Sequence, residues 1–296
     1  MVRIATRASA LARWQAERVA ALLGGDAELV LVTTEGDRDQ VSELHDIGGR
    51  GVFTREVQRA VLDGRADVAV HSAKDLESTT PDGLVLAAVP ERADPRDALV
   101  GSTLAGLPAG ARVGSGSVRR RAQLAHARPD LVFGPLRGNI GTRLARRAAA
   151  GYDAVVVAYA ALERLGLAAE ATEVLEPEVM LPQAAQGALA VECRSDDDVT
   201  RDRLVGIDDL VAHRAVTAER AFLAVLAASE PGGGCTIPCG ALADGAAATV
   251  EVEALLATVD GRTVRRARAA DADPRSAGRA VAAELLAALP PGPVNP

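Results

Sequence analysis

Lysine is almost absent from this chain, which has 296 residues, 33 lysine and arginine residues together, and a single lysine at position 74. An arginine guanidinium is a planar fork of five donors, whereas a lysine ammonium is a compact charge whose pKa changes readily on burial. The lysine lies in the segment His71-Ser72-Ala73-Lys74-Asp75. One interpretation is a function that requires an ammonium beside a carboxylate, and the other is chance survival in an arginine-rich composition.

Other shortages exclude whole classes of protein. Aromatic residues make up only 2% of the chain, which disfavours sites that stack bases on aromatic rings. Acidic residues outnumber basic ones by 40 to 33, so the chain lacks the basic surplus of a nucleic-acid-binding protein. The N-terminus has no apolar signal segment, and no run approaches the ~18 apolar residues of a membrane span. We therefore expect a cytoplasmic protein with no nucleic-acid or membrane partner.

Cysteine is also scarce, with three residues in the chain. They form neither an even disulfide framework nor a zinc-binding pattern with histidine, so no metal site is predicted. Cys193 lies in a strand-like segment and is expected to be a small buried apolar residue. Cys235 follows three glycines and precedes Thr236-Ile237-Pro238, a loop setting that exposes a thiolate for attack on an electrophile. No histidine base lies near Cys235 in the sequence, which argues against a hydrolase.

The hydrophobic pattern predicts a large α/β protein. With 48% hydrophobic residues, the chain is long enough for two or three domains. Short aliphatic runs alternate with amphipathic stretches, which is typical of parallel α/β units. The predicted strands are 2–6, 28–34, 67–71, 111–114, 131–133 and 153–158, and the predicted helices are 8–23, 52–62, 117–128 and 139–150. After a long helix at 209–227, strand-like runs and a final alanine-rich helix indicate a smaller α+β domain.

Arginine recurs where predicted strands meet predicted helices, in segments 6–9, 113–121 and 136–143. Free N–H groups at a helix start favour an anion, and arginine binds carboxylates through two parallel hydrogen bonds. Because none of these segments has the lysine of a phosphate-binding P-loop, we expect carboxylates rather than nucleotide phosphates. Any one arginine is equally well explained as part of a solvated helix face. The three junctions together predict a ligand with several carboxylates.

Taken in order along the chain, these segments resemble the porphobilinogen deaminase family, also called hydroxymethylbilane synthases. The resemblance rests on Arg3 to Arg7, His71 to Asp75, Gly114 to Arg120, Leu136 to Leu144, Leu181-Pro182 with Gln186-Gly187, and Gly233 to Pro238. It implies two α/β domains like those of periplasmic binding proteins, which form a cleft, and a smaller α+β C-terminal domain. The implied bounds are 1–89 with 187–205, 90–186, and 206–296, the last of which carries the cofactor cysteine.

The same resemblance implies the activity. The family are transferases that join four porphobilinogen molecules head to tail, release ammonia at each step, and yield hydroxymethylbilane for heme and other tetrapyrroles. The chain grows on a dipyrromethane primer held by a thioether to a cysteine, which here would be Cys235. Each pyrrole carries an acetate and a propionate, which a cleft lined with arginines suits. The resemblance further implies a monomer that passes its product to uroporphyrinogen III synthase.

Matching positions imply the roles of single residues. Asp75 would be catalytic, stabilising cationic pyrrole and accepting a proton, and the alternative is a salt-bridge partner with no proton role. The residues expected to bind cofactor or substrate carboxylates are Arg7, Ser9, Lys74, Ser117, Arg119, Arg120, Arg137, Arg143, Arg164 and Gln186. Three places depart from the family pattern: Arg50 replaces a lysine, Ser115-Gly116 stands where threonine and serine are common, and Cys239 adds a thiol near the attachment site.

Two other functions remain open from the residues. A carboxylate-binding protein without catalysis would share the cleft and the arginines, but it would not need Cys235 on a glycine-rich loop. An enzyme that forms a Schiff base on Lys74 would explain the lysine and leave the arginine junctions without a purpose.

Overall fold

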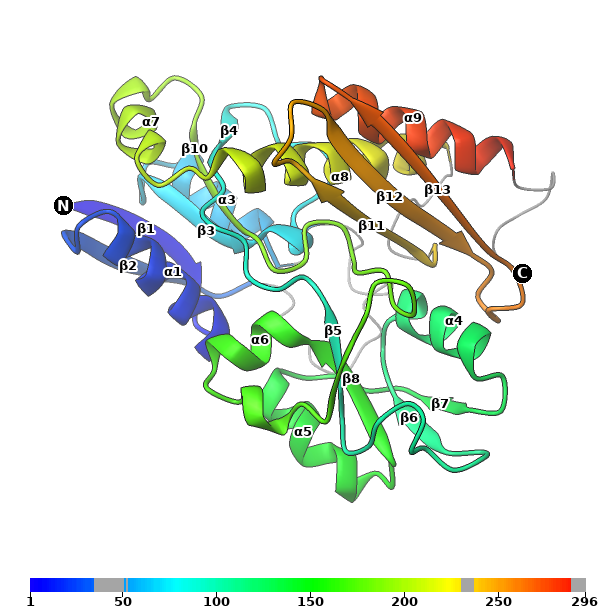
Figure 1. Ribbon diagram of the computed structural model, residues 1–296. Coiled ribbons are helices and arrows are strands. Elements are labelled where there is room, and N and C mark those ends of the chain that lie inside the picture. The colour runs from blue at the N-terminus through cyan, green and yellow to red at the C-terminus, as the bar shows by residue number, and fades with distance from the viewer. Residues whose placement is uncertain (35–50, 52, 230–236, 289–296) are drawn as a thin grey trace.

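Three β-sheets organise the computed structural model, which describes residues 1–34, 51, 53–229 and 237–288 (Figure 1). The first sheet has the strand order β2-β1-β3-β10-β4, with β1 (Val2–Arg7), β2 (Ala27–Val32), β3 (Val68–Ser72), β4 (Leu84–Ala88) and β10 (Leu189–Arg194). β1 pairs in parallel with β2 and β3, whereas β10 is antiparallel to both β3 and β4.

Helices cover both faces of the first sheet. They are α1 (Ala10–Leu22), α3 (Arg55–Leu62) and α7 (Asp198–Val205). Ile4 of β1 is buried in one cluster with α1 and α7, and its neighbour Ala5 is buried in another cluster with α3. Successive side chains of a strand point to opposite faces, so apolar residues at adjacent positions require a helix on each side.

The second sheet repeats this design with the order β7-β6-β8-β5-β9. Its strands are β5 (Asp97–Val100), β6 (Arg112–Gly114), β7 (Val132–Gly134), β8 (Ala154–Ala158) and β9 (Glu173–Leu175). The helices are α4 (Val118–Ala127), α5 (Ile140–Ala149) and α6 (Tyr159–Arg164), followed by the short η2 (Ala168–Glu170). Leu124 of α4 packs on one face, and Ile140 of α5 and Leu162 of α6 pack on the other.

The third sheet is an antiparallel meander of β11 (Cys239–Asp244), β12 (Val250–Ala257) and β13 (Val264–Asp271). Two long helices, α8 (Leu210–Ser229) and α9 (Pro274–Ala287), cover one face of it (Figure 1). Phe222, Leu226 and Val281 of these helices lie in one buried cluster with Val252 of β12. None of the helices in the described part of the chain is both long and apolar enough to cross a membrane.

The predicted fold class is confirmed: two α/β units and a smaller α+β unit. One detail of the prediction was wrong, because both large sheets are mixed rather than parallel. β5 and β10 begin just after the chain has crossed between the units, and each is antiparallel to the strands beside it. The domain bounds 1–89 with 187–205, 90–186 and 206–296 stay a prediction, which the membership of the strands supports.

The chain crosses from the first sheet to the second between β4 and β5 and returns between β9 and β10. One buried carboxylate of α8 binds both of these crossing segments. Glu219 accepts hydrogen bonds at 2.7 and 3.1 Å from the guanidinium of Arg92, in the first crossing. It also accepts from the backbone N–H of Ala185, in the second crossing, and from that of Ala243 in β11 at 2.8 Å. Ala185 is the non-glycine residue with a positive φ, 62°, a conformation that needs such outside support.

Gly278 of α9 lies where this helix packs closely against α8, so a substitution there tests how tightly the two helices pack. A Cβ at this position would collide with the carbonyl oxygen of Ala218 and lie 3.0 Å from Cβ of Ala221. Glycine to alanine normally stabilises a helix by roughly 1 kcal/mol, whereas overpacking costs about 1–3 kcal/mol. We expect Gly278→Ala to lower the free energy of unfolding measured by urea denaturation. The control is Arg279→Ala on the exposed side, with a change of about 0.5 kcal/mol or less, and a more stable Gly278→Ala would contradict the packing.

Candidate active site

The segment with the single lysine forms a short turn at the end of a buried strand. β3 leads directly into the 3-10 turn η1 (Ala73–Asp75), and Ala73 N–H donates to the carbonyl of Ala188 at 3.0 Å. Gln15 of α1 donates to the Ser72 hydroxyl at 2.7 Å. Within this fixed turn Asp75 is exposed and Lys74 is partly buried. The carboxylate is therefore accessible to a ligand while the ammonium points into the protein.

Lys74 lies in an environment that opposes its charge. Burial, followed by the nearby guanidinium of Arg120, lowers the pKa of Lys74 to about 8, although Asp75 and Asp97 act in the other direction. Its Nζ donates to Oε1 of Gln186 at 3.1 Å. An arginine at this position would stay charged at any physiological pH, so the lysine provides a cation whose charge depends on its surroundings.

Asp97 is the carboxylate around which the second unit arranges its arginines. It opens β5, is fully buried, and accepts from Nη2 of Arg119 at 2.7 Å and from Nη2 and Nε of Arg120 at 2.7 and 3.0 Å. Burial alone would raise the pKa of Asp97, but Arg119, Arg120 and Gln186 hold it well below its usual range. Asp97 is therefore ionised at neutral pH.

Arg119 and Arg120, which are predicted to bind ligand carboxylates, also have partners within the protein. Nη1 of Arg119 donates to the carbonyl of Leu181 at 2.6 Å, and Nη1 of Arg120 donates to that of Val156 at 3.1 Å. Both side chains are buried, and each already has Asp97 as a carboxylate partner. Nε of Arg119 is buried with no hydrogen-bond partner in the described structure. A direct contact of either arginine with a ligand stays a prediction.

Gln186 joins the two units within this network. Its side chain is fully buried, Nε2 donates to Asp97 at 2.9 Å and to the carbonyl of Pro95 at 2.7 Å, and Oε1 accepts from Lys74. The backbone carbonyl of Gln186 accepts from Nε of Arg92 at 2.9 Å. Because its amide is fully used by the protein, Gln186 positions Lys74 against Asp97, and the predicted contact with substrate stays a prediction.

Arg137 and Arg143 add positive charge without adding counter-charge. Nε of Arg143 donates to the carbonyl of Gly138 at 2.8 Å. Burial, then the cationic Arg120, lower the pKa of Arg143 to about 10, and Arg137 adds to this effect while Asp75 opposes it. Nη1 of Arg137 is buried, and no acceptor for it occurs among the described residues. Among the described residues, neither guanidinium forms an ion pair with a carboxylate.

These residues form one electrostatic cluster across the two units. It contains five cationic side chains and two carboxylates, an excess of three positive charges. The cationic members are Lys74, Arg119, Arg120, Arg137 and Arg143, and the acidic members are Asp75 and Asp97. An excess of partly buried cations, with one donor unpaired, is stabilised by a ligand that brings several carboxylates.

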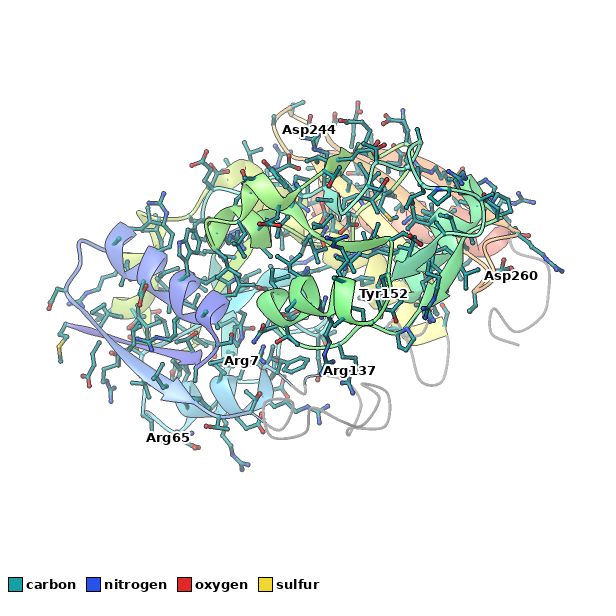
Figure 2. All side chains as sticks on the ribbon, turned by 90° about the horizontal axis from the view of Figure 1, so that it is seen from below. Arg7, Arg65, Arg137, Tyr152, Asp244 and Asp260 are labelled. Carbon is teal, nitrogen blue, oxygen red and sulfur yellow. The ribbon has the colours of Figure 1, made fainter. Side chains whose placement is uncertain are left out.

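The other predicted binding residues lie around this cluster. The guanidinium of Arg7, at the end of β1, lies 4.3 Å from the ring centre of Phe53. Arg164 stacks 5.6 Å from the ring centre of Trp14 and donates to the carbonyl of Gly187 at 2.5 Å, and burial lowers its pKa to about 10. Figure 2 shows Arg7 where the blue and green ribbons meet, and Arg137 below the green ribbon.

The two serines predicted to bind carboxylates cap helices. Ser9 Oγ accepts from the backbone N–H of Ala12 at 3.3 Å at the start of α1, and Ser117 Oγ accepts from that of Arg120 at 3.4 Å at the start of α4. Each hydroxyl thereby satisfies one orphan N–H of its helix. Ligand binding by Ser9 or Ser117 stays a prediction.

The cysteines divide between described and undescribed parts of the chain. Cys235, the predicted attachment site, and Arg50 lie outside the described residues. Cys193 is fully buried in β10, where burial raises its pKa to about 11, so its prediction as an inert apolar residue is confirmed. Cys239 is buried at the start of β11 and forms no disulfide in the described structure.

Sequence reasoning missed the carboxylates that organise the site. Asp97 stands in the segment Asp-Ala-Leu-Val, where the other residues are all apolar, and Glu219 lies among the buried residues of α8. A charged residue that interrupts a buried segment needs a partner of opposite charge. That signal identifies both positions as candidates, but it does not name their partners.

Comparison with known proteins decides the family. Residues 2–202 match the family model described as porphobilinogen deaminase, dipyromethane cofactor binding domain, and residues 213–287 match the model of the C-terminal domain. The chain belongs to the porphobilinogen deaminase family. A porphobilinogen deaminase of Roseiflexus castenholzii is 47% identical over 96% of this chain and 95% of its own. That of Sorangium cellulosum is 50% identical over 89% of each chain.

Among solved structures, the VFT2 domain of BvgS from Bordetella pertussis is similar with a TM-score of 0.40 and 15% identity, over 74% of this chain and 90% of that domain. Membership of the family confirms the predictions of an enzyme, a transferase of porphyrin and heme biosynthesis, and of dipyrromethane as the cofactor. A carboxylate-binding protein without catalysis is thereby excluded.

The described residues fit this cofactor. Dipyrromethane carries an acetate and a propionate on each pyrrole, and the cluster offers an excess of positive charge with the unpaired Nη1 of Arg137 among its donors. A carboxylate beside Arg143 or Lys74 would also reverse the lowering of their pKa values. The cluster thus has an excess of positive charge, and the carboxylates of the cofactor would supply the negative charge that balances it.

Removing the Asp97 carboxylate should be costly. In Asp97→Asn two buried guanidiniums lose their counter-charge, which lowers the free energy of unfolding at pH 7 by about 3–5 kcal/mol. Because the folded pKa of Asp97 is depressed, its contribution is complete above the unfolded pKa of about 3.9 and is lost as pH falls further. Urea unfolding should therefore show a constant difference between the two proteins from pH 7 down to about pH 4, and a smaller difference at more acidic pH.

The matched control is Asp130→Asn, which removes a partly exposed carboxylate paired with Arg128. A surface pair of this kind contributes about 1 kcal/mol or less. An equally small loss for Asp97→Asn at pH 7 would contradict the role of Asp97 as the anchor of the cluster.

The single lysine allows its pKa to be measured directly. Protein labelled with 13C at lysine Cε should give one resonance, which titrates at about 8 in folded, primer-free Cys235→Ser protein. Because the unfolded chain takes up this proton at a higher pH, about 10.4, stability falls as pH drops from there to the folded value. In wild-type protein with its primer the pKa should be higher. Titration above pH 10 in the folded, primer-free protein would contradict the burial of an uncompensated ammonium.

Proposed function

We propose that this chain polymerises four porphobilinogen molecules head to tail, with loss of ammonia, to give hydroxymethylbilane on a dipyrromethane primer held by a thioether to Cys235. The observation that carries this proposal is the excess of positive charge around Lys74, next to an exposed carboxylate, Asp75. The cations match the carboxylates of a pyrrole chain, and the lone accessible carboxylate matches the positive charge that its chemistry generates.

The binding of the acetate and propionate groups falls on cations of the cluster and of its edge. Arg137, Arg143 and Lys74 hold acetate and propionate groups, and Arg7 and Arg164 hold groups at the edge of the cluster. Arg119 and Arg120 act mainly through their charge, since Asp97 occupies their hydrogen bonds. The bound dipyrromethane supplies a nucleophilic pyrrole carbon and the point from which the chain grows.

Asp75 performs the catalytic work. When ammonia leaves porphobilinogen, positive charge develops on the substrate pyrrole, and a carboxylate within reach stabilises it. The same carboxylate takes the proton that the attacking ring carbon loses on bond formation. Lys74 and Arg143 both place positive charge near Asp75, so the carboxylate lies at the edge of a cationic cluster.

The proposal also includes what the resemblance implies about the setting of the enzyme. We infer that the protein is a cytoplasmic monomer and that it passes hydroxymethylbilane to uroporphyrinogen III synthase. The reactive linear product gives a reason for such a transfer, because a following enzyme protects it from side reactions in water.

Asp75→Asn tests the catalytic assignment. Loss of a positioned acid–base group lowers turnover by roughly 10²–10⁴-fold, so porphobilinogen consumption should fall by that factor. The asparagine keeps the size of the side chain, and the variant should still carry the primer. Intact mass of the denatured protein would then show an excess of two condensed pyrroles, as in the wild type.

Two variants serve as controls for that experiment. Cys235→Ser should show no mass excess, since it lacks the proposed attachment atom. Glu77→Gln removes the carboxylate two residues further along, which pairs with Arg55, and should leave turnover near that of the wild type. Normal turnover in Asp75→Asn would exclude Asp75 as the catalytic residue, and a mass excess in Cys235→Ser would exclude Cys235 as the attachment site.

A further inference from the structure

Next to the catalytic turn lie three buried polar side chains that the proposed function does not use. They are His71 of β3, Glu192 of β10 and Arg220 of α8, which are 5%, 0% and 9% exposed. Three elements from distant parts of the chain therefore bring titratable groups to one interior place. Two of these elements belong to the first sheet, and the third belongs to the unit that packs on β11–β13.

The sheet register brings His71 and Glu192 together. His71 is paired with Ala190, and Glu192 with Ala69, so both side chains point to the same face as diagonal neighbours. Nε2 of His71 lies 3.3 Å from Oε2 of Glu192, and Nε2 of Gln58 in α3 donates to the same oxygen at 2.8 Å. Burial raises the pKa of Glu192, but His71, Gln58 and Arg220 together hold it below its usual value.

Arg220 links this pair to the other side of the catalytic turn. Its charge acts on Glu192, and its Nη2 donates to Oγ1 of Thr80 at 3.3 Å. His71 lies four residues before Asp75, and Thr80 lies five residues after it. One guanidinium of α8 thus contacts the segment that follows Lys74-Asp75 and places its charge near the His71–Glu192 pair that precedes it.

Stability alone does not explain this arrangement. Moving an ion into the protein interior costs several kcal/mol, and apolar side chains of similar volume are often as stabilising as a buried ion pair. Oε1 of Glu192 and Nη1 of Arg220 are buried with no hydrogen-bond partner in the described structure, which adds to the cost. What a charged network provides, and apolar packing does not, is a fixed direction between the groups that it joins.

We propose that Arg220, Glu192 and His71 are positioning residues that hold the Lys74-Asp75 turn in register with α8. The last residue of this helix in the described structure, Ser229, precedes Cys235 by six residues. The network would therefore align the catalytic carboxylate with the unit that carries the primer. This inference rests on the proposed function, in which Asp75 and Cys235 act on the same pyrrole chain.

The test compares turnover per primed molecule in Arg220→Met, Glu192→Gln and the double variant. Intact mass gives the fraction of each protein that carries the primer, and porphobilinogen consumption gives kcat and KM for that fraction. Misalignment of reacting groups by about 1 Å costs up to roughly 10²-fold, so we expect kcat to fall tenfold or more in each single variant. KM should stay within about twofold, because the carboxylate-binding cations are unchanged.

The double variant separates positioning from simple damage to the fold. Residues that act as one unit are non-additive, so it should lose no more kcat than the worse single variant. The matched control is Arg214→Met, an arginine of the same helix whose guanidinium donates only to backbone carbonyls of Gly245, Ala247 and Ala248. Its kcat per primed molecule should equal that of the wild type.

Two outcomes would overturn the proposal: single variants with wild-type kcat per primed molecule, or losses that multiply in the double variant. If Arg220→Met does not fold, Thr80→Val removes only the hydroxyl that Arg220 contacts, and it should lower kcat without raising KM. The wild type tests the proposed function separately. A wild type without primer or turnover would refute that function, whereas an active wild type with fully active variants would refute only the positioning role.

Discussion

The ion pairs of Asp97 are the interaction on which the rest of the site depends. Two adjacent guanidiniums and the ammonium of Lys74 would repel one another in a buried place, and a fully buried carboxylate between them makes the assembly possible. The carboxylate compensates only part of the charge. What remains is a fixed positive field, held by protein groups that do not themselves need to move when a ligand carboxylate arrives.

This anchor lies where it does because of the crossing segments. Asp97 is the first residue of β5, just after the chain has left the first sheet, and Gln186 ends the second crossing. Glu219 of α8 holds Arg92 and Ala185 beside them, including the strained positive φ of Ala185. The charge network and the connections between the three units are therefore built from the same residues. A movement of one unit would change the positions of the charged groups around Lys74.

Local patterns predicted much of this structure, and tertiary contacts account for what they missed. The alternation of strands and helices and the buried Cys193 follow from periodicity and residue chemistry within a short window. Asp97 and Arg119 are 22 residues apart, and their contact depends on how β5 enters the sheet. The return of β10 to the first sheet was likewise implied only by the family resemblance. Free arginines and arginines paired inside the protein look alike in a sequence.

The excess positive charge of the site is explained by the enzyme that carries its primer, because the carboxylates of the primer neutralise it. Burial, followed by the charge of Arg120, lowers the pKa of Lys74 to about 8 and that of Arg143 to about 10, and a donor of Arg137 is buried without an acceptor among the described residues. A group that binds the folded state and not the unfolded state stabilises the folded state. Carboxylates of the primer supply that stabilisation, so part of the folding energy of the first two units resides in the cofactor that they hold.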